Sequence, residues 1–412
     1  MNFFYLSRKN LSSKPLSTFL SLMLFALGIS LITILLLLND QFQKQFDKNL
    51  AGIDLVIGAK GSPLQLILSG MYHLDAPTGN IPITEIQPFL RKNHPLIGEV
   101  VPLSLGDSYK GFRIVGTTLD FFELYKGAFQ IGQVWTKPMQ AVLGFAVAQK
   151  LNLKIGDTFQ SSHGLKEDDD LIHDGHQPIQ IVGILKPSGT VMDQLLLTDF
   201  RTVWEVHNKQ NSNSSSLEES SIATLASFDD QSITSLLVKL KSRNFQALNF
   251  QRNINENTNL QAATPAIEIN RLYANIGLGI SLLRALAIAI VLVSGISIFV
   301  SLYNSLKDRK YEMALMRVMG GSRFKLFKLI LLEGFTLAVL GWLLGVTIGH
   351  LGLEVIANSL ESSYKYSISG FILISEEWYI LWASILIGIL ASLVPAIGAA
   401  RTNIHQTLSE GK

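Results

Sequence analysis

Four long apolar runs, separated by one large gap and two short ones, constrain the fold more than any other feature of the sequence. The runs cover residues 16–38, 285–303, 329–349 and 378–400. About 20 consecutive apolar residues suffice for a helix to cross the hydrocarbon core of a bilayer. We therefore predict one membrane span, a large α+β domain of residues 39–274 outside the membrane, and three further spans.

The composition agrees with a chain divided between membrane and water. Of the 412 residues, 48% are hydrophobic and 16% are charged, which is too apolar for an ordinary soluble protein and too polar for a protein buried wholly in lipid. There is no cysteine, which excludes disulfides, thiolate metal sites and thiol nucleophiles. The net charge of +2 tells little, because the sign varies from region to region.

The first apolar run could also be read as a cleaved signal peptide. Such a peptide has a shorter apolar core, followed by a small-residue cleavage site. Here the run is followed by Asn39-Asp40-Gln41-Phe42, so we predict an uncleaved anchor. For residues 1–15 we predict a short amphipathic helix on the inner membrane face, with a frayed basic tail as the alternative.

The distribution of charge predicts the orientation. Residues 304–328, here called the basic segment, hold seven cations and two acids: Lys307, Arg309, Lys310, Arg317, Arg323, Lys325, Lys328, Asp308 and Glu312. The loop 350–377 holds Lys365 and four glutamates. Cytoplasmic loops are enriched in Lys and Arg. We therefore place both termini, including the tail 401–412, and the basic segment in the cytoplasm, with 39–274 and 350–377 outside.

Short alternating patterns in residues 39–274 predict mixed strands and helices. The predicted strands are Asp54–Ile57, Val100–Leu105, Phe112–Thr117, Ala141–Leu143, Ile179–Leu185 and Ile233–Leu240, with a turn at 58–63 and a helix at Ala146–Leu151. Residues 249–259 are polar and rich in asparagine, and no element is predicted there. Residues 266–286 have helical spacing, start after Thr264-Pro265 and run into the second span. An ordinary linker is the alternative.

No motif predicts catalysis. The Walker pattern of Gly, four residues and Gly-Lys-Ser/Thr is absent, so we predict no ATP hydrolysis by this chain. One loop gathers possible metal ligands: His163, Asp168, Asp169, Asp170, His173, Asp174 and His176. Their spacing fits no standard site, and we favour a solvated acidic loop over metal binding. The basic residues lie at the membrane face, so nucleic-acid binding is unsupported.

Two features of the third apolar run stand out. Its glycines recur every four residues and predict a smooth strip for close helix packing, within the chain or across a dimer: Gly341, Gly345 and Gly349. Glu333 is an acid within the run, which makes it a candidate functional group. With Lys328 and Arg323 nearby in sequence, we favour an interfacial salt bridge or a structural tie to another helix.

The sequence resembles the permease subunits of MacB/FtsX-type (type VII) ABC transporters over nearly its whole length. Residues 307–322, KDRKYEMALMRVMGGS, are similar to a signature of that family at Arg309, Glu312, Ala314, Arg317, Gly320 and Ser322. The external core domain of the family is resembled by Val142-Leu143-Gly144, by Ile181–Leu185, and by Pro187, Gly189, Thr190 and Asp193. Because no ATPase is fused to the chain, it is most like the stand-alone permeases of the LolC/LolE type.

The resemblance implies a function and its partners. Two permeases, identical or related, would pair above a separate ABC ATPase dimer that carries the ATP and Mg, so this chain would bind no cofactor itself. The residues that couple to the ATPase would be Lys307, Arg309, Lys310, Glu312, Arg317, Gly320, Ser322 and Arg323. The protein would lie in a bacterial inner membrane, and motion would pass to residues 39–274 in the periplasm to extrude a lipoprotein, peptide or hydrophobic compound. A periplasmic adaptor would be a further partner. The alternative is an FtsX-like regulator that activates a cell-envelope partner such as a peptidoglycan hydrolase.

Overall fold

The computed structural model describes residues 3–11, 15–163, 178–207, 220–242, 245–364 and 368–401. The chain divides into two compact units. The membrane unit contains Met1–Phe42 and Asn275–Lys412, and the external unit contains Gln43–Ala274. The loop that gathers possible metal ligands lies almost wholly outside the described residues, which omit 164–177.

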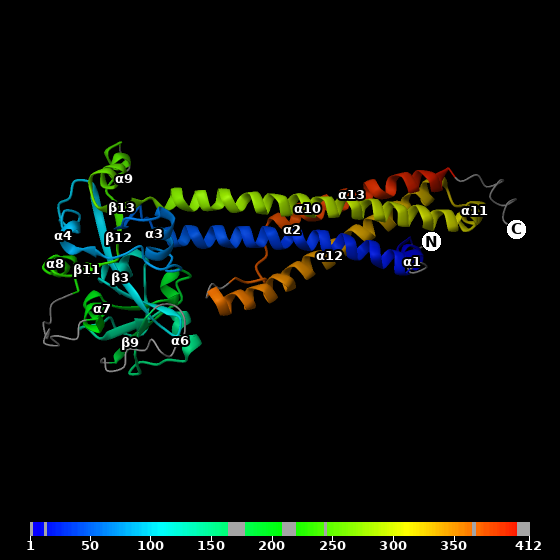
Figure 1. Ribbon diagram of the computed structural model, residues 1–412. Helices are drawn as coiled ribbons and strands as arrows, with labels where there is room; N and C mark the ends of the chain where they lie inside the picture. The colour runs from blue at the N-terminus through cyan, green and yellow to red at the C-terminus, as the bar shows by residue number, and fades with distance from the viewer. Residues whose placement is uncertain are drawn as a thin grey trace. The chain divides into compact units, whose positions relative to one another are not determined.

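Among the described residues the membrane unit is a bundle of four long helices and two short ones (Figure 1). Its helices are α1 (Phe3–Leu11), α2 (Pro15–Leu50), α10 (Pro265–Asp308), α11 (Lys310–Val318), α12 (Arg323–Tyr364) and α13 (Glu376–Ala400). Among the described residues, α2, α10, α12 and α13 are long and apolar enough to cross a membrane. This confirms the predicted fold class of one span, an inserted domain and three spans.

Helix α10 begins at Pro265 and runs without interruption to Asp308. The backbone carbonyl of Thr264 accepts the first helical bonds, from Ile267 N at 3.1 Å and Glu268 N at 3.2 Å. The missing N–H of a proline costs nothing at the first position of a helix. The helix predicted over 266–286 is therefore present and continuous with the second apolar run.

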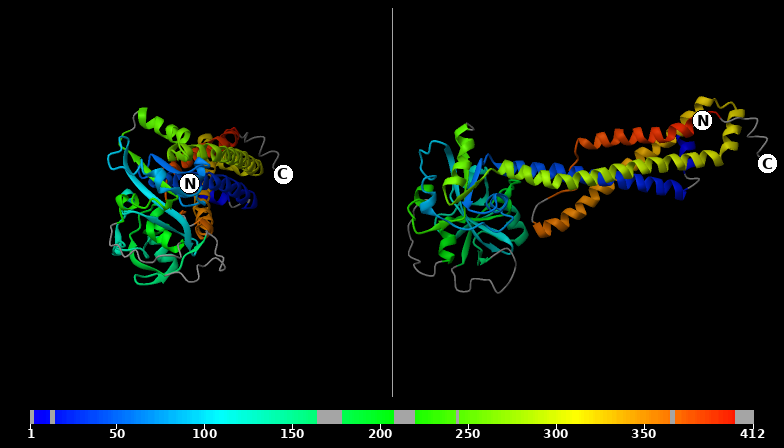
Figure 2. Two further views of the ribbon diagram at one scale, coloured as in Figure 1. Left: turned by 60° about the vertical axis from the view of Figure 1, so that its left-hand side comes forward. Right: turned by 45° about the horizontal axis from the view of Figure 1, so that its top comes forward.

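Helix α12 is much longer than the third apolar run, and Figures 1 and 2 show it extending past the start of α13. The expected loop 350–377 is helical as far as Tyr364. Leu353 and Ala357, one turn apart, are fully buried, and Leu353 packs with Leu37 of α2. The prediction of a loop was wrong here because burial along one helix face continues after the apolar run ends.

The glycine strip of α12 faces α2 within the same chain. A β-carbon added at Gly341 would lie 2.5 Å from a ring carbon of Phe25, and one at Gly345 would lie 2.6 Å from Ile29 Cβ. One at Gly349 would lie 3.0 Å from the Cβ of Thr33, also on α2. Small residues allow two helix backbones to approach closely in a membrane. The structure thus assigns the strip to an intrachain contact.

We expect Gly345→Leu to destabilise the membrane unit by about 1–3 kcal/mol, since α2 leaves no room for a side chain at this position. The matched control is Gly279→Leu, where a β-carbon would meet nothing within 4 Å. Thermal unfolding of the two purified full-length variants in detergent measures the difference. Equal midpoints would show that the strip is not a tight contact.

The external unit is built on a mixed sheet of eleven strands. Nine follow the order β13-β1-β12-β3-β4-β10-β6-β9-β5, while β7 pairs with β9 and β8 pairs with β3. The bounds are β1 (Leu55–Ala59), β3 (Ile97–Tyr109), β4 (Phe112–Thr117), β5 (Phe129–Gly132), β6 (Gln140–Leu143), β7 (Thr158–Phe159), β8 (Ser162–His163), β9 (Ile179–Leu185), β10 (Leu196–Asp199), β12 (Ser235–Leu240) and β13 (Leu260–Ala263). A small second sheet pairs β2 (Ile81–Pro82) with β11 (Ser232–Ile233).

Helices cover this sheet and close its two main cores. They are α3 (Pro63–Gly70), α4 (Ile83–Ile86), α5 (Asp120–Leu124), α6 (Phe145–Leu151), the 3-10 helix η2 (Val191–Gln194), α7 (Phe200–His207), α8 (Ile222–Leu225) and α9 (Phe245–Asn257). Along β1, Val56 packs in one core with Leu66 of α3, while Leu55 and Ile57 face the other. This alternation is the period-2 pattern of a strand with both faces covered.

Two stretches of the external unit differ from what the sequence indicated. Residues 249–259 mostly form α9, because Phe250 and Ile254, four apart, are buried in the core despite their polar neighbours. The expected turn at 58–63 is shorter than predicted. Gly58 and Ala59 complete β1, and the Ser62 hydroxyl accepts a hydrogen bond from Gln65 N and caps α3.

One carboxylate, that of Asp193, holds the loop after β9 in shape. Asp193 accepts hydrogen bonds from Ser188 N at 2.8 Å, from the Ser188 hydroxyl at 2.7 Å and from Gly189 N at 2.7 Å. Gly189 has φ +69°, a conformation that favours glycine. The next turn is fastened to α2 by Val191 N, which donates to Asn49 Oδ1 at 2.9 Å. These motif residues therefore hold a loop in shape.

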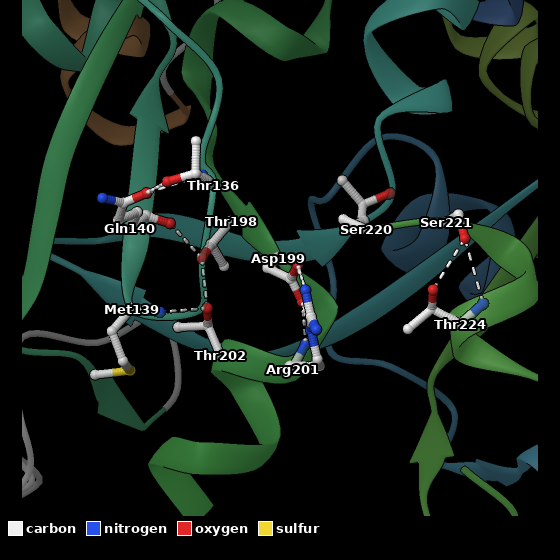
Figure 3. Close-up of polar contacts among 11 residues, drawn as sticks. Thr136, Met139, Gln140, Thr198, Asp199, Arg201, Thr202, Ser220, Ser221 and Thr224 are labelled. Carbon is white, nitrogen blue, oxygen red and sulfur yellow. Dashed lines mark hydrogen bonds and ion pairs between the residues drawn. The ribbon is translucent and has the colours of Figure 1, made fainter. Parts of the chain in front are cut away.

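A buried polar network joins β10 to α7 (Figure 3). Arg201 Nε and Nη2 donate to the two oxygens of Asp199 at 2.8 and 2.7 Å, and both side chains are buried. Beside them, the Thr198 and Thr202 hydroxyls lie 2.8 Å apart, and Thr202 accepts from Met139 N at 3.0 Å. A hydrogen-bonded ion pair offsets part of the free energy that removing its two charges from water costs. We therefore interpret the network as structural.

Candidate functional site

The basic segment is folded against the end of the helical bundle. It comprises the last residues of α10, all of α11, a turn and the start of α12. Met313 and Ala314 of α11 are fully buried, and Met313 packs in a core with Leu306, Ala396 and Ala399. Helix α11 therefore keeps one face on the bundle and presents the other to its surroundings.

Gly320 and Ser322 shape the turn between α11 and α12. Gly320 has φ +94°, and Gly321 N donates to the carbonyl of Met316 at 2.9 Å, which closes the end of α11. The Ser322 hydroxyl accepts from Lys325 N at 3.3 Å and caps the start of α12. The two residues were predicted to couple to an ATPase, and the structure gives each of them a structural reason to be there.

Arg309 points into the bundle. Its side chain is only 11% exposed, and its Nη2 lies 3.7 Å from Glu333 Oε1. Its Nε lies 3.7 Å from Glu312 Oε2, and its Nη1 donates to the Ser305 hydroxyl at 3.4 Å. Arg309 therefore connects the junction of α10 and α11 to α12, which a docking residue on the surface would not do.

Glu333 is the centre of this arrangement. Its side chain is 2% exposed, and its Oε1 also accepts a hydrogen bond from Asn10 Nδ2 at 2.6 Å. One carboxylate thus ties α1 and the α10–α11 junction to α12. This is the expected tie to other helices, made by residues far away in sequence.

The two cations that sequence proximity suggested are placed elsewhere. The Lys328 ammonium lies 4.6 Å from the centre of the Phe324 ring, and Arg323 is exposed. Five positions along an α-helix rotate a side chain by about 140° around the axis, so Lys328 faces away from Glu333.

The remaining charged residues predicted to couple lie on the surface of the basic segment. Lys307, Lys310 and Glu312 are exposed, and Arg317 is half-buried. They are interleaved with large exposed apolar side chains on α11 and its turn: Tyr311, Leu315, Val318 and Met319. We call these four residues the apolar stripe.

The apolar stripe is not among the site residues predicted from the sequence. Its members recur at i, i+4, i+7 and i+8, the spacing of one helix face. The signal was therefore present, but Met313 and Ala314 form a second apolar face of the same helix. Which face meets the bundle could not be decided from the pattern. Elsewhere, the described residues contain no group of three or more His, Cys, Asp or Glu side chains that could hold a metal ion.

Two family models match the chain and together cover most of its length. A model of the MacB-like periplasmic core domain matches residues 18–251, more than half of the chain, and a model of the FtsX-like permease C-terminal region matches residues 284–404. The chain belongs to the MacB/FtsX-type ABC permeases. Permeases of this family are non-catalytic transmembrane subunits that work with an ABC ATPase, and their large domain lies outside the cytoplasm.

Two solved structures match the permease over about half its length. The periplasmic region of MacB from Actinobacillus actinomycetemcomitans is 12% identical with a TM-score of 0.33, and the match covers 54% of the permease and 95% of that chain. The extracellular domain of the noncanonic ABC-type transporter YknZ from Gram-positive bacteria is 15% identical with a TM-score of 0.29, covering 52% and 99%. No curated relative matches the permease.

Proposed function

We propose that the permease docks a separate ABC ATPase on the exposed face of its basic segment and passes ATP-driven motion to its external domain. The observation that carries this proposal is the apolar stripe, set among Lys307, Lys310 and Glu312. Interfaces combine an apolar centre with a charged rim. We place both termini and the basic segment in the cytoplasm, because cytoplasmic loops are enriched in Lys and Arg.

The path of α10 supports transmission of the motion. One uninterrupted helix of 44 residues ends at Asp308, inside the basic segment, and begins at Pro265, a residue of the external unit. At 1.5 Å per residue this helix is about 66 Å long. Displacement at its docked end can reach the external domain without a break in the helix.

The work done outside is the extrusion or release of a cargo, which we propose to be a lipoprotein, a peptide or a hydrophobic compound. A second permease, identical or related, completes the complex, and a periplasmic adaptor extends it where the cargo must travel further. The large external domain matched by the MacB-like model supports this function.

The FtsX-like match supports a second function equally. In that case the external domain, moved in the same way, activates a cell-envelope partner such as a peptidoglycan hydrolase. Purification of the intact complex in mild detergent separates the two functions. Co-purification of a hydrolase supports regulation, and co-purification of an adaptor or of a lipid-anchored protein supports extrusion.

We expect Leu315→Asp/Met319→Asp to reduce the amount of co-purifying ABC ATPase about tenfold or more, because loss of central apolar contacts commonly costs at least 1–2 kcal/mol of binding. Both residues are exposed, so the bundle keeps its fold. The matched control adds the same charges at Ile131 and Ile155, two exposed isoleucines of the external unit. Unchanged ATPase recovery from the Leu315/Met319 variant would place the docking surface elsewhere.

A further inference from the structure

The described residues between α12 and α13, 368–375, are non-helical, yet side chains of the bundle form hydrogen bonds with their backbone. We call these residues the strap. Its bonded backbone groups and their partners are Ser369 N and O with Gln41 at 2.9 Å each, Gly370 N with Glu354 Oε2 at 2.7 Å, Gly370 O with His350 Nδ1, and Ile374 N with Glu377 Oε1 at 3.2 Å. Helices α2, α12 and α13 all contribute.

The strap lies directly on α12. A β-carbon added at Gly370 would collide with the carbonyl oxygen of His350 and would lie 2.8 Å from the backbone nitrogen of Glu354. Helix backbone cannot move aside as a flexible side chain can. Position 370 therefore needs glycine for the strap to reach its partners.

Two buried ionisable side chains, His350 and Glu377, lie next to each other under the strap. A carbonyl oxygen can only accept, so His350 Nδ1 carries a hydrogen and donates it to Gly370. His350 Nε2 lies 3.2 Å from Glu377 Oε1, and both side chains are buried. The His350 side chain therefore lies between the strap and the start of α13.

The outward side of the strap is apolar. Phe371 is 69% exposed, Leu373 is 79% exposed, and Ile372 between them is 41% exposed. Trp378, at the start of α13, is also largely exposed. Tryptophan is enriched at the interface between membrane and water.

These observations together point to lipid. Non-helical backbone is tolerated at membrane depth only where protein groups satisfy its hydrogen bonds. The strap meets this condition at Ser369, Gly370 and Ile374, and its three central side chains are apolar. We propose that the strap is inserted into the bilayer leaflet distal to the basic segment, where Phe371, Ile372 and Leu373 contact lipid acyl chains.

The proposal replaces the expectation that the whole of 350–377 lies in water. It rests on α12 and α13 as membrane spans and is independent of the proposed docking of an ATPase. Failure of either one leaves the other standing.

The absence of cysteine from the chain allows a direct test. Leu373→Cys is labelled with a nitroxide in the full-length permease, which is then reconstituted in phosphatidylcholine/phosphatidylglycerol vesicles. Spin relaxation by oxygen, which concentrates in lipid, is compared with relaxation by a water-soluble nickel chelate. The references are Leu343→Cys, an exposed position in the middle of α12, and Ala128→Cys, an exposed position in the external domain.

We expect Leu373→Cys to show an oxygen-to-nickel ratio close to that of Leu343→Cys and several-fold above that of Ala128→Cys. A ratio like that of Ala128→Cys would place the strap in water and overturn the proposal. An immobile label reached by neither reagent would show that a second protein chain covers the strap, which also overturns it.

A second variant tests the role of the hydrogen-bonded backbone. Adding Gly370→Ala to the labelled Leu373→Cys protein forces the strap off α12, and we expect the ratio to shift toward the water reference. If this protein does not fold, Gln41→Leu removes both bonds to Ser369 and serves the same purpose. A ratio that stays at the lipid value in the folded variant would show that these bonds do not hold the strap in the leaflet.

Discussion

Replacing Arg309 with alanine is expected to destabilise the helical bundle by about 3–5 kcal/mol, because it leaves Glu333 buried without its cation. The Glu333 side chain is 2% exposed, so bulk water solvates its carboxylate poorly. Asn10 would remain as a hydrogen-bond donor, but an amide does not neutralise a charge. Thermal unfolding of the purified full-length permease in detergent measures the loss.

Two further variants make this prediction specific. Arg323→Ala removes an exposed cation from the same basic segment and should change stability little. Arg309→Ala/Glu333→Gln removes both charges and should recover much of the stability lost in the single variant. Equal unfolding midpoints for Arg309→Ala and Arg323→Ala would show that the Arg309–Glu333 contact contributes nothing.

This result bears on how charge reversals in the basic segment are interpreted. Arg309, Glu312 and Arg317 were expected to act alike in coupling to an ATPase. Glu312 is 67% exposed, so its reversal tests docking, whereas reversal of Arg309 would place two acids together in the bundle. Loss of function in an Arg309 variant therefore needs the stability measurement beside it.

Acidification is expected to destabilise the external domain through His73. Burial, with a smaller contribution from the nearby Arg113 charge, lowers the pKa of His73 from its ordinary value of 6.5 to about 3. In the described part of the chain neither ring nitrogen of His73 has a hydrogen-bond partner. The folded domain therefore holds the imidazole neutral where an unfolded chain would protonate it.

The sign follows from proton binding. Between pH 6.5 and about 3 the unfolded state binds a proton that the folded state does not, so stability falls as the pH falls through this range. Well below pH 6.5 each pH unit costs about 1.4 kcal/mol, so lowering the pH from 7.5 to 4.5 should cost about 2.7 kcal/mol. Above pH 6.5 the effect disappears.

Chemical denaturation of the full-length permease and of His73→Asn, at pH 7.5 and pH 4.5, tests this prediction. Asparagine suits the site because it does not titrate and tolerates the positive φ of +56° at this position. The stability of the wild type should drop by about 2.7 kcal/mol more than that of the variant. A smaller slope remains in both, since the pKa of His94 is also lowered, by burial and by Lys241 and Arg91. The same pH dependence in both proteins would exclude His73 as its source.

Much of the architecture could be predicted from local patterns. The four apolar runs predicted the four long helices, and Thr264-Pro265 marked the start of α10. The strands Phe112–Thr117 and Ile179–Leu185 were found with the predicted bounds. These predictions succeed because apolar runs, alternation and helix starts depend on residues that are close together in the chain.

The location of the candidate site could be predicted from the sequence, but the orientation of its side chains could not. The density of cations between two spans pointed to residues 304–328. Which of these side chains face outward depends on the face that α11 packs on the bundle, and the sequence offered two apolar faces. Arg309 was grouped with the surface residues because a cation in the sequence does not indicate that it pairs with a buried acid on another helix.

By itself the sequence determined the number of spans, the inserted domain, the helix continuous with the second span and the family, all of which follow from short-range order. Only the tertiary structure decided that Glu333 pairs with Arg309 and Asn10, that the glycine strip faces α2, and that the strap is bonded to three helices. Each of these contacts joins residues from different helices, so each depends on how the helices rotate and pack against one another.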